Sequence, residues 1–364
     1  MTSLRTRRPF HALVLRRRLK GKLDYFLPEG DFRLAARCER MRVDRNGSIL
    51  SVLLIRLPKG HRSEPDVDFL SRVLEGRLRL TDTPGLLDNG NVAILLPDTN
   101  EEGAWKVATD VSEVYPPGPD RPECEVMTYP GRNRRRRHEA EEAGEEQVAA
   151  APDNDSDPSE LFFAKPLPAW KRGIDILGSL LGLVAVSPVI GVAAIAVKST
   201  SPGPAFFVQE REGLGGRRFR IFKLRTMTVD ADRRKHELRV HSDQDGPAFK
   251  MRCDPRITSV GRFLRWSSID ELPQLINVLR GEMSLVGPRP LPTEESQACE
   301  DWHRRRLEVT PGITCTWQVS GRGQVRFDDW VRMDLHYIAG HSLWKDFKLV
   351  AATLPSLLFH RGIR

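Results

Sequence analysis

The apolar segment from Ile176 to Val197 constrains this chain more than any other feature, because it contains no charged residue. A helix of that length can cross the hydrocarbon core of a bilayer, which is about 30 Å thick. Ser187 and Pro188 lie at its middle, and a proline removes a helical hydrogen bond and kinks or breaks the helix. Each arm then has about 11 residues and extends roughly 16 Å. The pattern therefore predicts two arms that reach only the middle of the bilayer.

The residues that flank this segment are basic on both sides, with Lys171-Arg172 before it and Lys198 after it. Positive charge marks the cytoplasmic side of a membrane segment, so neither end is marked as external. We expect a re-entrant membrane helix over residues 174–198, broken at Ser187 and Pro188, with both ends in the cytosol. A kinked spanning helix is the alternative, and a buried helix of a soluble core fits the length less well.

The composition narrows the class of partner without choosing one. The 364 residues include 57 Lys and Arg against 49 Asp and Glu, and the pI is near 9.4. Such a chain suits nucleic acid, lipid head groups or a phosphorylated substrate. Its five cysteines are odd in number and form no C-x-x-C pair, which predicts reduced thiols and excludes a disulfide framework and a zinc site.

Changes in composition divide the chain into four zones. The first is a basic tail that either lies on an anionic membrane surface or is disordered. The second alternates apolar runs with turn signals, and the third is rich in proline and charge. The fourth carries the apolar segment and the chemistry. The zones are residues 1–29, 30–117, 118–164 and 165–364.

The second zone is predicted to be a small α/β domain. Ser51 to Leu57 is typical of a strand, and Asp88-Asn89-Gly90-Asn91 indicates a hairpin turn that enters a strand over Val92 to Leu96. Glu101 to Val114 has helical apolar spacing.

The third zone, residues 118–164, is predicted to be a disordered charged linker. It follows Pro116-Pro117 and contains the arginine run 134–137 and an acidic run over 139–146. Such a segment buries too little apolar surface to offset its ordering entropy. The arginine run is either solvated or in contact with phospholipid or nucleic acid.

From Lys171 onward the chain resembles the bacterial sugar transferase family, the monotopic phosphoglycosyl transferases that load the first sugar onto undecaprenyl phosphate. The resemblance covers about 190 residues and rests on consecutive motifs, with Cys315 standing where the family usually has glycine. The motifs are Lys171-Arg172-Gly173-Ile174-Asp175, Ser187-Pro188, Ser201 to Phe207, Gln209 to Gly213, Phe222 to Met227, Asp254 to Thr258, Ser268 to Gln274, Met283 to Pro290, Pro311 to Thr314 and Trp317-Gln318.

The resemblance implies an α+β fold in which a re-entrant membrane hairpin carries a mainly helical cytosolic catalytic domain. It implies transfer of a sugar-1-phosphate from a UDP-sugar to undecaprenyl phosphate, the first membrane step of exopolysaccharide, capsule or O-antigen synthesis. The location implied is the cytoplasmic face of a bacterial inner membrane. The partners are then the UDP-sugar, undecaprenyl phosphate and membrane lipid, with no nucleic acid, and a homodimer is one option for the oligomeric state.

Asp270 and Glu271 are the candidate catalytic residues. Taken by themselves, two adjacent acids after Ser268 are typical of a helix N-terminus, with the serine as cap and the acids facing the helix dipole. The resemblance implies instead that they are the catalytic pair, with Asp270 attacking the β-phosphate and forming a covalent aspartyl-phosphosugar intermediate. Mg²⁺ is the expected metal, held by Asp270 or Glu271 and the substrate phosphates.

Four basic residues are the candidate ligands of the substrate phosphates. A carboxylate that attacks a diphosphate meets two anions, so cations must screen its approach. Arg265 lies five residues before Asp270, and Arg289 stands between two prolines. Lys223 and Arg225 alternate as on one face of a strand. For each of them a solvated surface charge is the plainer alternative.

The small domain faintly resembles the GGDEF-type cyclase fold, mainly over residues 79–108. Gly90 and Asn91 then stand where that family has its Asp and Glu, and Ile55-Arg56-Leu57 replaces another metal-binding carboxylate. The resemblance implies a degenerate scaffold or regulatory module. Two other classes compete with the enzyme for the whole chain: a non-catalytic membrane adaptor with a basic cytosolic domain, and a membrane-tethered nucleic-acid binder. The Asp270-Glu271 pair together with Arg265 and Arg289 argues against the adaptor. Binding to nucleic acid that weakens steeply with salt and ignores nucleotide sugar would support the third class.

Overall fold

The structure is a computed structural model that describes residues 25–58, 64–118, 121–131, 157–251, 253–320, 325–340 and 342–358. The chain divides into two compact units, residues 1–151 and residues 152–364. Residues 1–24 of the predicted basic tail and residues 132–156 of the predicted linker lie outside the described residues.

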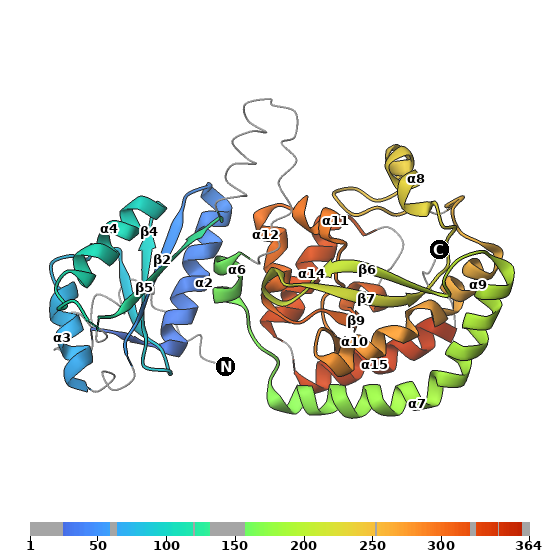
Figure 1. The fold of residues 1–364 in the computed structure, drawn as a ribbon, viewed down its shortest axis with the longest axis horizontal. Helices are drawn as coiled ribbons and strands as arrows, with labels where there is room; N and C mark the ends of the chain where they lie inside the picture. Colours follow the sequence, from blue (N-terminus) through green and yellow to red (C-terminus); the bar gives the residue numbers. More distant parts are fainter. Residues whose placement is uncertain are drawn as a thin grey trace, which may run out of the picture. The chain divides into compact units, whose positions relative to one another are not determined.

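The first unit is a five-stranded sheet with helices on both faces (Figure 1). The strand order is β1-β3-β4-β2-β5, and every pair is antiparallel except β1 with β3. Alternation along β2 directs Leu53 and Ile55 to the core formed with α3 and α4. Its elements are β1 (Leu27–Pro28), α2 (Glu29–Asn46), β2 (Leu50–Arg56), α3 (Glu64–Leu74), β3 (Thr83–Leu86), β4 (Val92–Pro97), α4 (Glu101–Ser112) and β5 (Glu123–Tyr129).

The hairpin between β3 and β4 forms where the sequence predicted it. The Leu87 amide donates to the Asn91 carbonyl at 2.9 Å, and the Gly90 amide donates to the Leu87 carbonyl at 2.8 Å. Gly90 has a φ of 79°, a conformation that glycine adopts without steric cost. The strand predicted over residues 51–57 and the helix predicted over 101–114 are likewise confirmed as β2 and α4.

The linker prediction over residues 118–164 is wrong at both ends. Glu123–Tyr129 forms β5, which pairs with β2 along its whole length, so the prolines at 116 and 117 belong to a loop of this unit. Pro158–Phe163 forms helix α6 of the second unit, where the side chain of Asp157 accepts a hydrogen bond from the Ser159 amide at 2.8 Å. An acidic N-cap and a proline in the first turn favour a helix there.

The second unit is a mixed α+β unit with short two-stranded sheets and many helices. Strands β6 and β7 form an antiparallel pair, and β8 and β9 form a parallel pair. Its elements are α6 (Pro158–Phe163), α7 (Ala169–Thr200), β6 (Phe206–Glu212), η2 (Leu214–Gly216), β7 (Arg218–Leu224), α8 (Ala231–Leu238), η3 (Arg239–His241), α9 (Ser259–Ser267), η4 (Ile269–Gln274), α10 (Leu275–Arg280), β8 (Ser284–Val286), α11 (Thr293–Gln297), α12 (Asp301–Arg304), η5 (Arg305–Glu308), β9 (Gly312–Thr314), α13 (Thr316–Ser320), α14 (Phe327–Ala339) and α15 (Leu343–Leu358).

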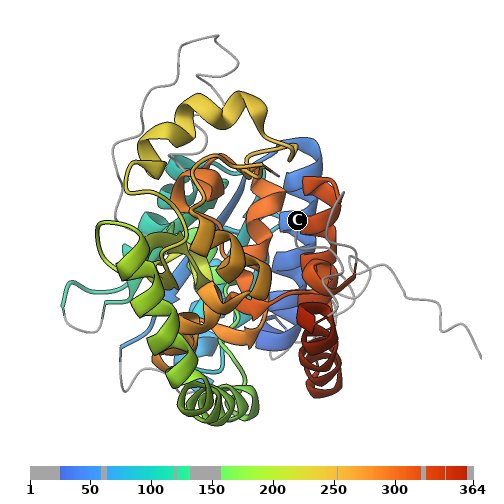
Figure 2. The same ribbon diagram turned by 90° about the vertical axis from the view of Figure 1, so that its right-hand side faces the viewer.

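Helix α7 is one continuous helix of 32 residues with Pro188 inside it. The break predicted at Ser187 and Pro188 is a bend instead: Figures 1 and 2 show two arms of α7 that point in different directions. Proline removes one hydrogen bond of the helix and is the usual cause of a sharp bend. The hydroxyl of Ser187 donates to the Val184 carbonyl at 3.0 Å. The helix also starts before and ends after the predicted range of 174–198.

Both arms of α7 are anchored to the second unit, although most of their apolar surface is exposed. The first arm is held where Arg172 donates to the carbonyls of Val278 and Leu279, at the end of α10. The second arm buries Val197 in a cluster with β7 and α9. The most apolar window of α7 has a mean hydropathy of 2.5 and only 11% of it is buried, so by length and composition the helix could cross a membrane. Within the described residues, α7 is therefore not buried as a core helix would be.

Candidate active site

The Asp270-Glu271 pair lies in the first turn of the 3-10 helix η4, directly after α9. Ser268 joins the two helices with a φ of 56°, a left-handed conformation that is uncommon outside glycine. Its side chain makes no capping hydrogen bond, so the predicted serine cap is wrong, although the acids do begin a helix. A backbone fixed in this turn presents two adjacent carboxylates in different directions.

Glu271 is held by two cations. Lys223 Nζ, from β7, donates to Glu271 Oε1 at 2.8 Å. Arg289, from the loop after β8, forms a bidentate pair with the same carboxylate, with Nη1 donating to Oε2 at 3.2 Å. Although burial favours the neutral carboxyl, the charges of Arg289 and Lys223 hold the pKa of Glu271 well below its usual range. Glu271 is therefore an anion whose oxygens are already engaged.

Asp270 differs from its neighbour in having no such partner. It is 7% exposed, and among the described residues its carboxylate accepts no hydrogen bond and forms no ion pair. Burial, helped by the charge of Glu271, raises the pKa of Asp270 to about 6, while Lys223 and Arg265 oppose this shift. At neutral pH Asp270 is thus an ionised carboxylate close to several cations and without a hydrogen-bond donor among the described residues, which is the state a nucleophile requires.

Arg265 is positioned by the close packing of α9 against the end of β7. Its Nε donates to Thr226 Oγ1 at 2.9 Å. A Cβ at Gly261 would lie 2.0 Å from the Thr226 carbonyl oxygen, so only glycine permits this approach. Lys223, Arg265 and Arg289 therefore lie near the two acids, and their role as phosphate ligands stays a prediction.

Arg225, the fourth predicted phosphate ligand, points elsewhere. Strand β7 ends at Leu224, so the alternation that would have put Arg225 beside Lys223 stops before it. Its guanidinium donates to the carbonyls of Ser201 and Pro202 and to the hydroxyl of Ser201, with Nη2 at 2.9 Å from the Ser201 carbonyl. It holds the loop between α7 and β6, and this position does not support a role in binding phosphate.

Arg211 is a charged residue near the site that the sequence did not single out. Its Nη1 donates to the Pro290 carbonyl at 2.7 Å, and its Nη2 donates to Gln209 Oε1 at 2.8 Å. Burial and the nearby charge of Arg289 lower the pKa of Arg211 to about 10. The residue stood within one of the sequence motifs, but only its contact with the Pro290 carbonyl shows that it lies beside the loop that carries Arg289.

The carboxylates of the site fit a metal ion that takes most of its ligands from the substrate and water. Among the described residues no group of three or more Asp, Glu, His or Cys side chains could hold a metal ion. Mg²⁺ commonly takes one or two carboxylates and fills its other positions with water and phosphate oxygens. Asp270 could provide one such carboxylate, whereas both oxygens of Glu271 are engaged by Lys223 and Arg289.

The arrangement suits chemistry on a diphosphate. An unpaired carboxylate can attack phosphorus, and three fixed cations can neutralise an anionic substrate and the charge that develops in the reaction. Three further acids of this unit, Asp254, Glu282 and Asp334, have structural partners: Arg256 at 2.6 Å, Asn277 at 2.7 Å and Arg306 at 2.7 Å.

Known relatives of this chain match about half of its residues. A relative described as UDP-glucose:undecaprenyl-phosphate glucose-1-phosphate transferase, from Caulobacter vibrioides, is 45% identical over 202 residues, covering 52% of this chain and 69% of the relative. The galactosyl transferase CpsE of Streptococcus agalactiae is 43% identical over 195 residues, covering 53% of this chain and 43% of the relative. The undecaprenyl-phosphate galactose phosphotransferase of Salmonella typhimurium is 39% identical, covering 53% of this chain and 41% of the relative.

The matches leave the rest of these proteins uncovered, because the chain spans about two fifths of the length of CpsE and of the Salmonella protein. Among solved structures, a DGC protein from Thermotoga maritima is similar at a TM-score of 0.26 and 14% identity, covering 29% of this chain and 82% of that chain. A score this low supports no conclusion about fold, so the GGDEF-like domain stays a prediction.

The family profile matches the part of the chain that holds the site. The profile described as bacterial sugar transferase matches residues 167–360, more than half of the chain. That range contains α7, the Asp270-Glu271 pair and the cations around it. The chain therefore belongs to the bacterial sugar transferase family.

Proposed function

We propose that this chain transfers a sugar-1-phosphate from a UDP-sugar to undecaprenyl phosphate, with Asp270 as the nucleophile. The relatives with about 40% identity are named as undecaprenyl-phosphate glucose or galactose transferases, which supports the reaction class. Their names differ in the sugar, so the identity of the hexose stays open. Others are named for exopolysaccharide production, which supports a role in that kind of pathway.

The observation that carries the proposal is the contrast between the two adjacent acids. Glu271 is held by Lys223 and Arg289, whereas Asp270 is buried without a partner among the described residues. An unpaired buried carboxylate costs stability, and such a cost is typical of functional sites. A purely structural helix start would not need it.

The reaction proceeds by two displacements at one phosphorus atom. An Asp270 oxygen forms a bond to the β-phosphorus, the bond from that phosphorus to the bridging oxygen breaks, and UMP leaves with the electron pair. An oxygen of undecaprenyl phosphate then attacks the same phosphorus, and the bond to Asp270 breaks to restore the carboxylate. Lys223, Arg265 and Arg289 are well placed to neutralise the phosphates in both steps.

Mg²⁺, when bound, would neutralise charge on the diphosphate and so make UMP a better leaving group. Asp270 is the side chain best able to provide a ligand before attack, since the oxygens of Glu271 are engaged. Glu271 keeps Lys223 and Arg289 in place beside the substrate.

Helix α7 supports a membrane location for this site. Its exposed residues are almost all apolar, with Val184 69% and Ile195 71% exposed, and its two arms are anchored to the same unit. Such a bent helix suits re-entrant insertion from the cytoplasmic side. Exposed aromatic side chains on α15, Trp344 and Phe347, suit the interface where a lipid phosphate would lie.

The proposal is tested by measuring UMP release from a panel of UDP-sugars with Mg²⁺ and undecaprenyl phosphate, for the full chain in detergent or lipid. We expect release with one sugar, lost on adding EDTA and in Asp270→Asn. Intact-mass measurement without the acceptor should show a gain of one sugar-phosphate on the wild type and none on Asp270→Asn.

Asp254→Asn is the matched control, because Asp254 is paired with Arg256 and lies outside the catalytic pair. It should keep the covalent mass gain as long as it folds. UMP release that persists in Asp270→Asn would rule out the nucleophile, and silence across the whole panel would favour the adaptor.

A further inference from the structure

The loop from Gly287 to Pro290 carries Arg289 into the site, and its sequence limits how it can be held. Pro288 and Pro290 have no backbone N–H to donate. The Gly287 amide donates to the Thr314 carbonyl at 3.0 Å, and a Cβ there would lie 2.6 Å from the Thr310 carbonyl oxygen. Beyond Gly287, the backbone of this loop has to be fixed mainly through its carbonyl oxygens.

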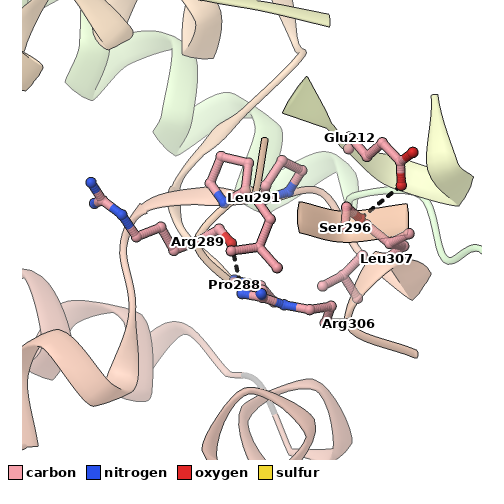
Figure 3. A pocket seen from close by; sticks show the side chains of 11 residues that line it. Glu212, Pro288, Arg289, Leu291, Ser296, Arg306 and Leu307 are labelled. Carbon is pink, nitrogen blue, oxygen red and sulfur yellow. Dashed lines mark hydrogen bonds between the residues drawn. The ribbon is translucent and has the colours of Figure 1, made fainter. Parts of the chain in front are cut away.

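Two arginines hold successive carbonyls of this loop. Arg306 Nη2 donates to the Arg289 carbonyl at 2.6 Å, and Arg211 Nη1 donates to the Pro290 carbonyl at 2.7 Å. In Figure 3 a dashed line joins the Arg289 carbonyl directly to Arg306 in the wall of a small pocket, while the Arg289 side chain extends away from Arg306. The backbone contact thus fixes the point from which the Arg289 guanidinium projects toward Glu271.

Arg306 depends in turn on Asp334, from α14. Arg306 Nη2 donates to Asp334 Oδ2 at 2.7 Å, and the side chains are 4% and 1% exposed. A buried ion pair contributes little net stability compared with an apolar pair of the same size. The presence of this ion pair beside the site is explained if Asp334 holds Arg306 so that its Nη2 donates to the Arg289 carbonyl.

We propose that Arg306, held by Asp334, is a positioning residue that directs the Arg289 guanidinium at Glu271 and at the donor diphosphate. It acts on the reaction only through Arg289. A shift of about 1 Å in a group that binds the reacting phosphates can cost roughly a hundredfold in rate. This inference rests on the proposed function, and it adds two residues that touch no substrate.

A double-mutant cycle tests the inference, since residues that act through one another give non-additive effects. We expect Arg306→Lys to lower kcat for UMP release about tenfold in the wild-type background and less than about twofold in the Arg289→Ala background. Equal losses in both backgrounds would overturn the proposal. Asp334→Asn keeps Arg306 but removes the charge of its partner, and it should give the same large loss in the wild-type background and small loss in the Arg289→Ala background. It replaces Arg306→Lys in the cycle if Arg306→Lys does not fold.

Hydrogen exchange provides a second measurement that needs no activity. Amides of residues 284–291 should exchange about tenfold faster in Arg306→Lys than in the wild type. The matched control is Arg304→Lys, because Arg304 is also buried and is paired with Glu160 and Glu212, and among the described residues its hydrogen bonds go to residues outside this loop. Exchange in the loop that is unchanged in Arg306→Lys, or equally faster in Arg304→Lys, would overturn the inference.

The two measurements separate the inference from the proposed function. If the wild type releases no UMP from any UDP-sugar, the proposed function fails, and the exchange experiment alone decides whether Arg306 holds the loop. If the wild type is active and the cycle is additive, the proposed function stands and the positioning role fails.

Discussion

The first unit buries apolar side chains between its sheet and helices, including Leu53, Leu70 and Ile94, each 0% exposed. Among its described residues, only Arg40 and Asp82 are both charged and buried. The second unit buries many more charges, from Glu160 and Arg304 to Arg306, Asp334 and Asp270. Burial of a charge is tolerated when it is paired, and Asp270 is the member of this set for which the described residues provide no partner. The comparison indicates that the second unit gives up stability to keep a defined set of charges out of water.

The largest expected effect comes from removing the unpaired charge. Asp270→Asn should lower turnover by at least about 10³-fold, because the nucleophile is lost. It should also raise the melting temperature at pH 7. The pKa of Asp270 is raised from its ordinary 3.8 to about 6, so the folded state binds the proton more tightly and loses stability as pH rises through that range. Paired activity and thermal melts at pH 7 check both parts.

If Asp270→Asn were both inactive and less stable, the comparison between a paired and an unpaired buried charge would fail. Asp254→Asn provides the opposite case, because it removes the carboxylate charge that balances the buried guanidinium of Arg256. It should lower the melting temperature while retaining turnover in the folded fraction.

Breaking a paired charge in the second unit should cost stability rather than activity. Glu160→Ala removes one of the two carboxylates that hold Arg304 and should destabilise the unit by about 3 kcal/mol. The matched change in the first unit, Glu125→Ala, breaks an exposed pair with Arg56 and should cost under about 1 kcal/mol. Denaturant unfolding, followed by fluorescence, compares the two; similar costs would contradict the contrast between the units.

The dependence of kcat/KM on pH tests the ionisation of Asp270 in the active enzyme. Asp270 attacks only when ionised, and burial together with Glu271 raises its pKa to about 6. We therefore expect kcat/KM to fall about tenfold per pH unit below 6 and to be flat above it. Residual activity in Glu271→Gln should have its acidic limb at lower pH, because one cause of the raised pKa is gone.

Asp334 also has a pKa raised to about 6 by burial, against the opposing charge of Arg306, so it needs a separate test. Asp334→Asn should leave the acidic limb in place even though it lowers the rate. A limb that moves in Asp334→Asn and not in Glu271→Gln would assign the titration to the positioning pair instead.

Local sequence patterns correctly predicted those strands, turns and helices whose formation depends on residues close together in the chain. The strand over 51–57 and the turn at Gly90 followed from alternation and from turn chemistry. Helix α6 was missed although Asp157 and Pro158 are local signals for a helix start, and its Glu160 is also held by Arg304, which lies 144 residues further along the chain. Strand β5 was missed because a proline-rich loop was taken for the end of the domain.

For the site, the sequence predicted which residues belong to it but not how their side chains are arranged. Its motifs identified Asp270, Glu271, Lys223, Arg265 and Arg289, and these side chains gather in the structure. That Glu271 and not Asp270 takes the cations depends on the direction of each side chain in η4, which no spacing reveals. The positions of Arg211 and Arg306 depend on tertiary contacts of the loop at Arg289.

The smallest expected effect concerns Arg225, which the sequence grouped with Lys223. Its hydrogen bonds to the carbonyls of Ser201 and Pro202 imply that Arg225→Lys loosens the loop after α7, with a stability cost of about 1 kcal/mol. The KM for the UDP-sugar should stay within about twofold of the wild type, whereas Arg289→Lys should raise it or lower kcat about tenfold or more. Steady-state kinetics of the two variants, at matched folded concentration, compare a structural arginine with one in the site. Equal kinetic losses in the two variants would indicate that Arg225 also binds the substrate phosphates. They would mean that the loop after α7 moves when the UDP-sugar binds.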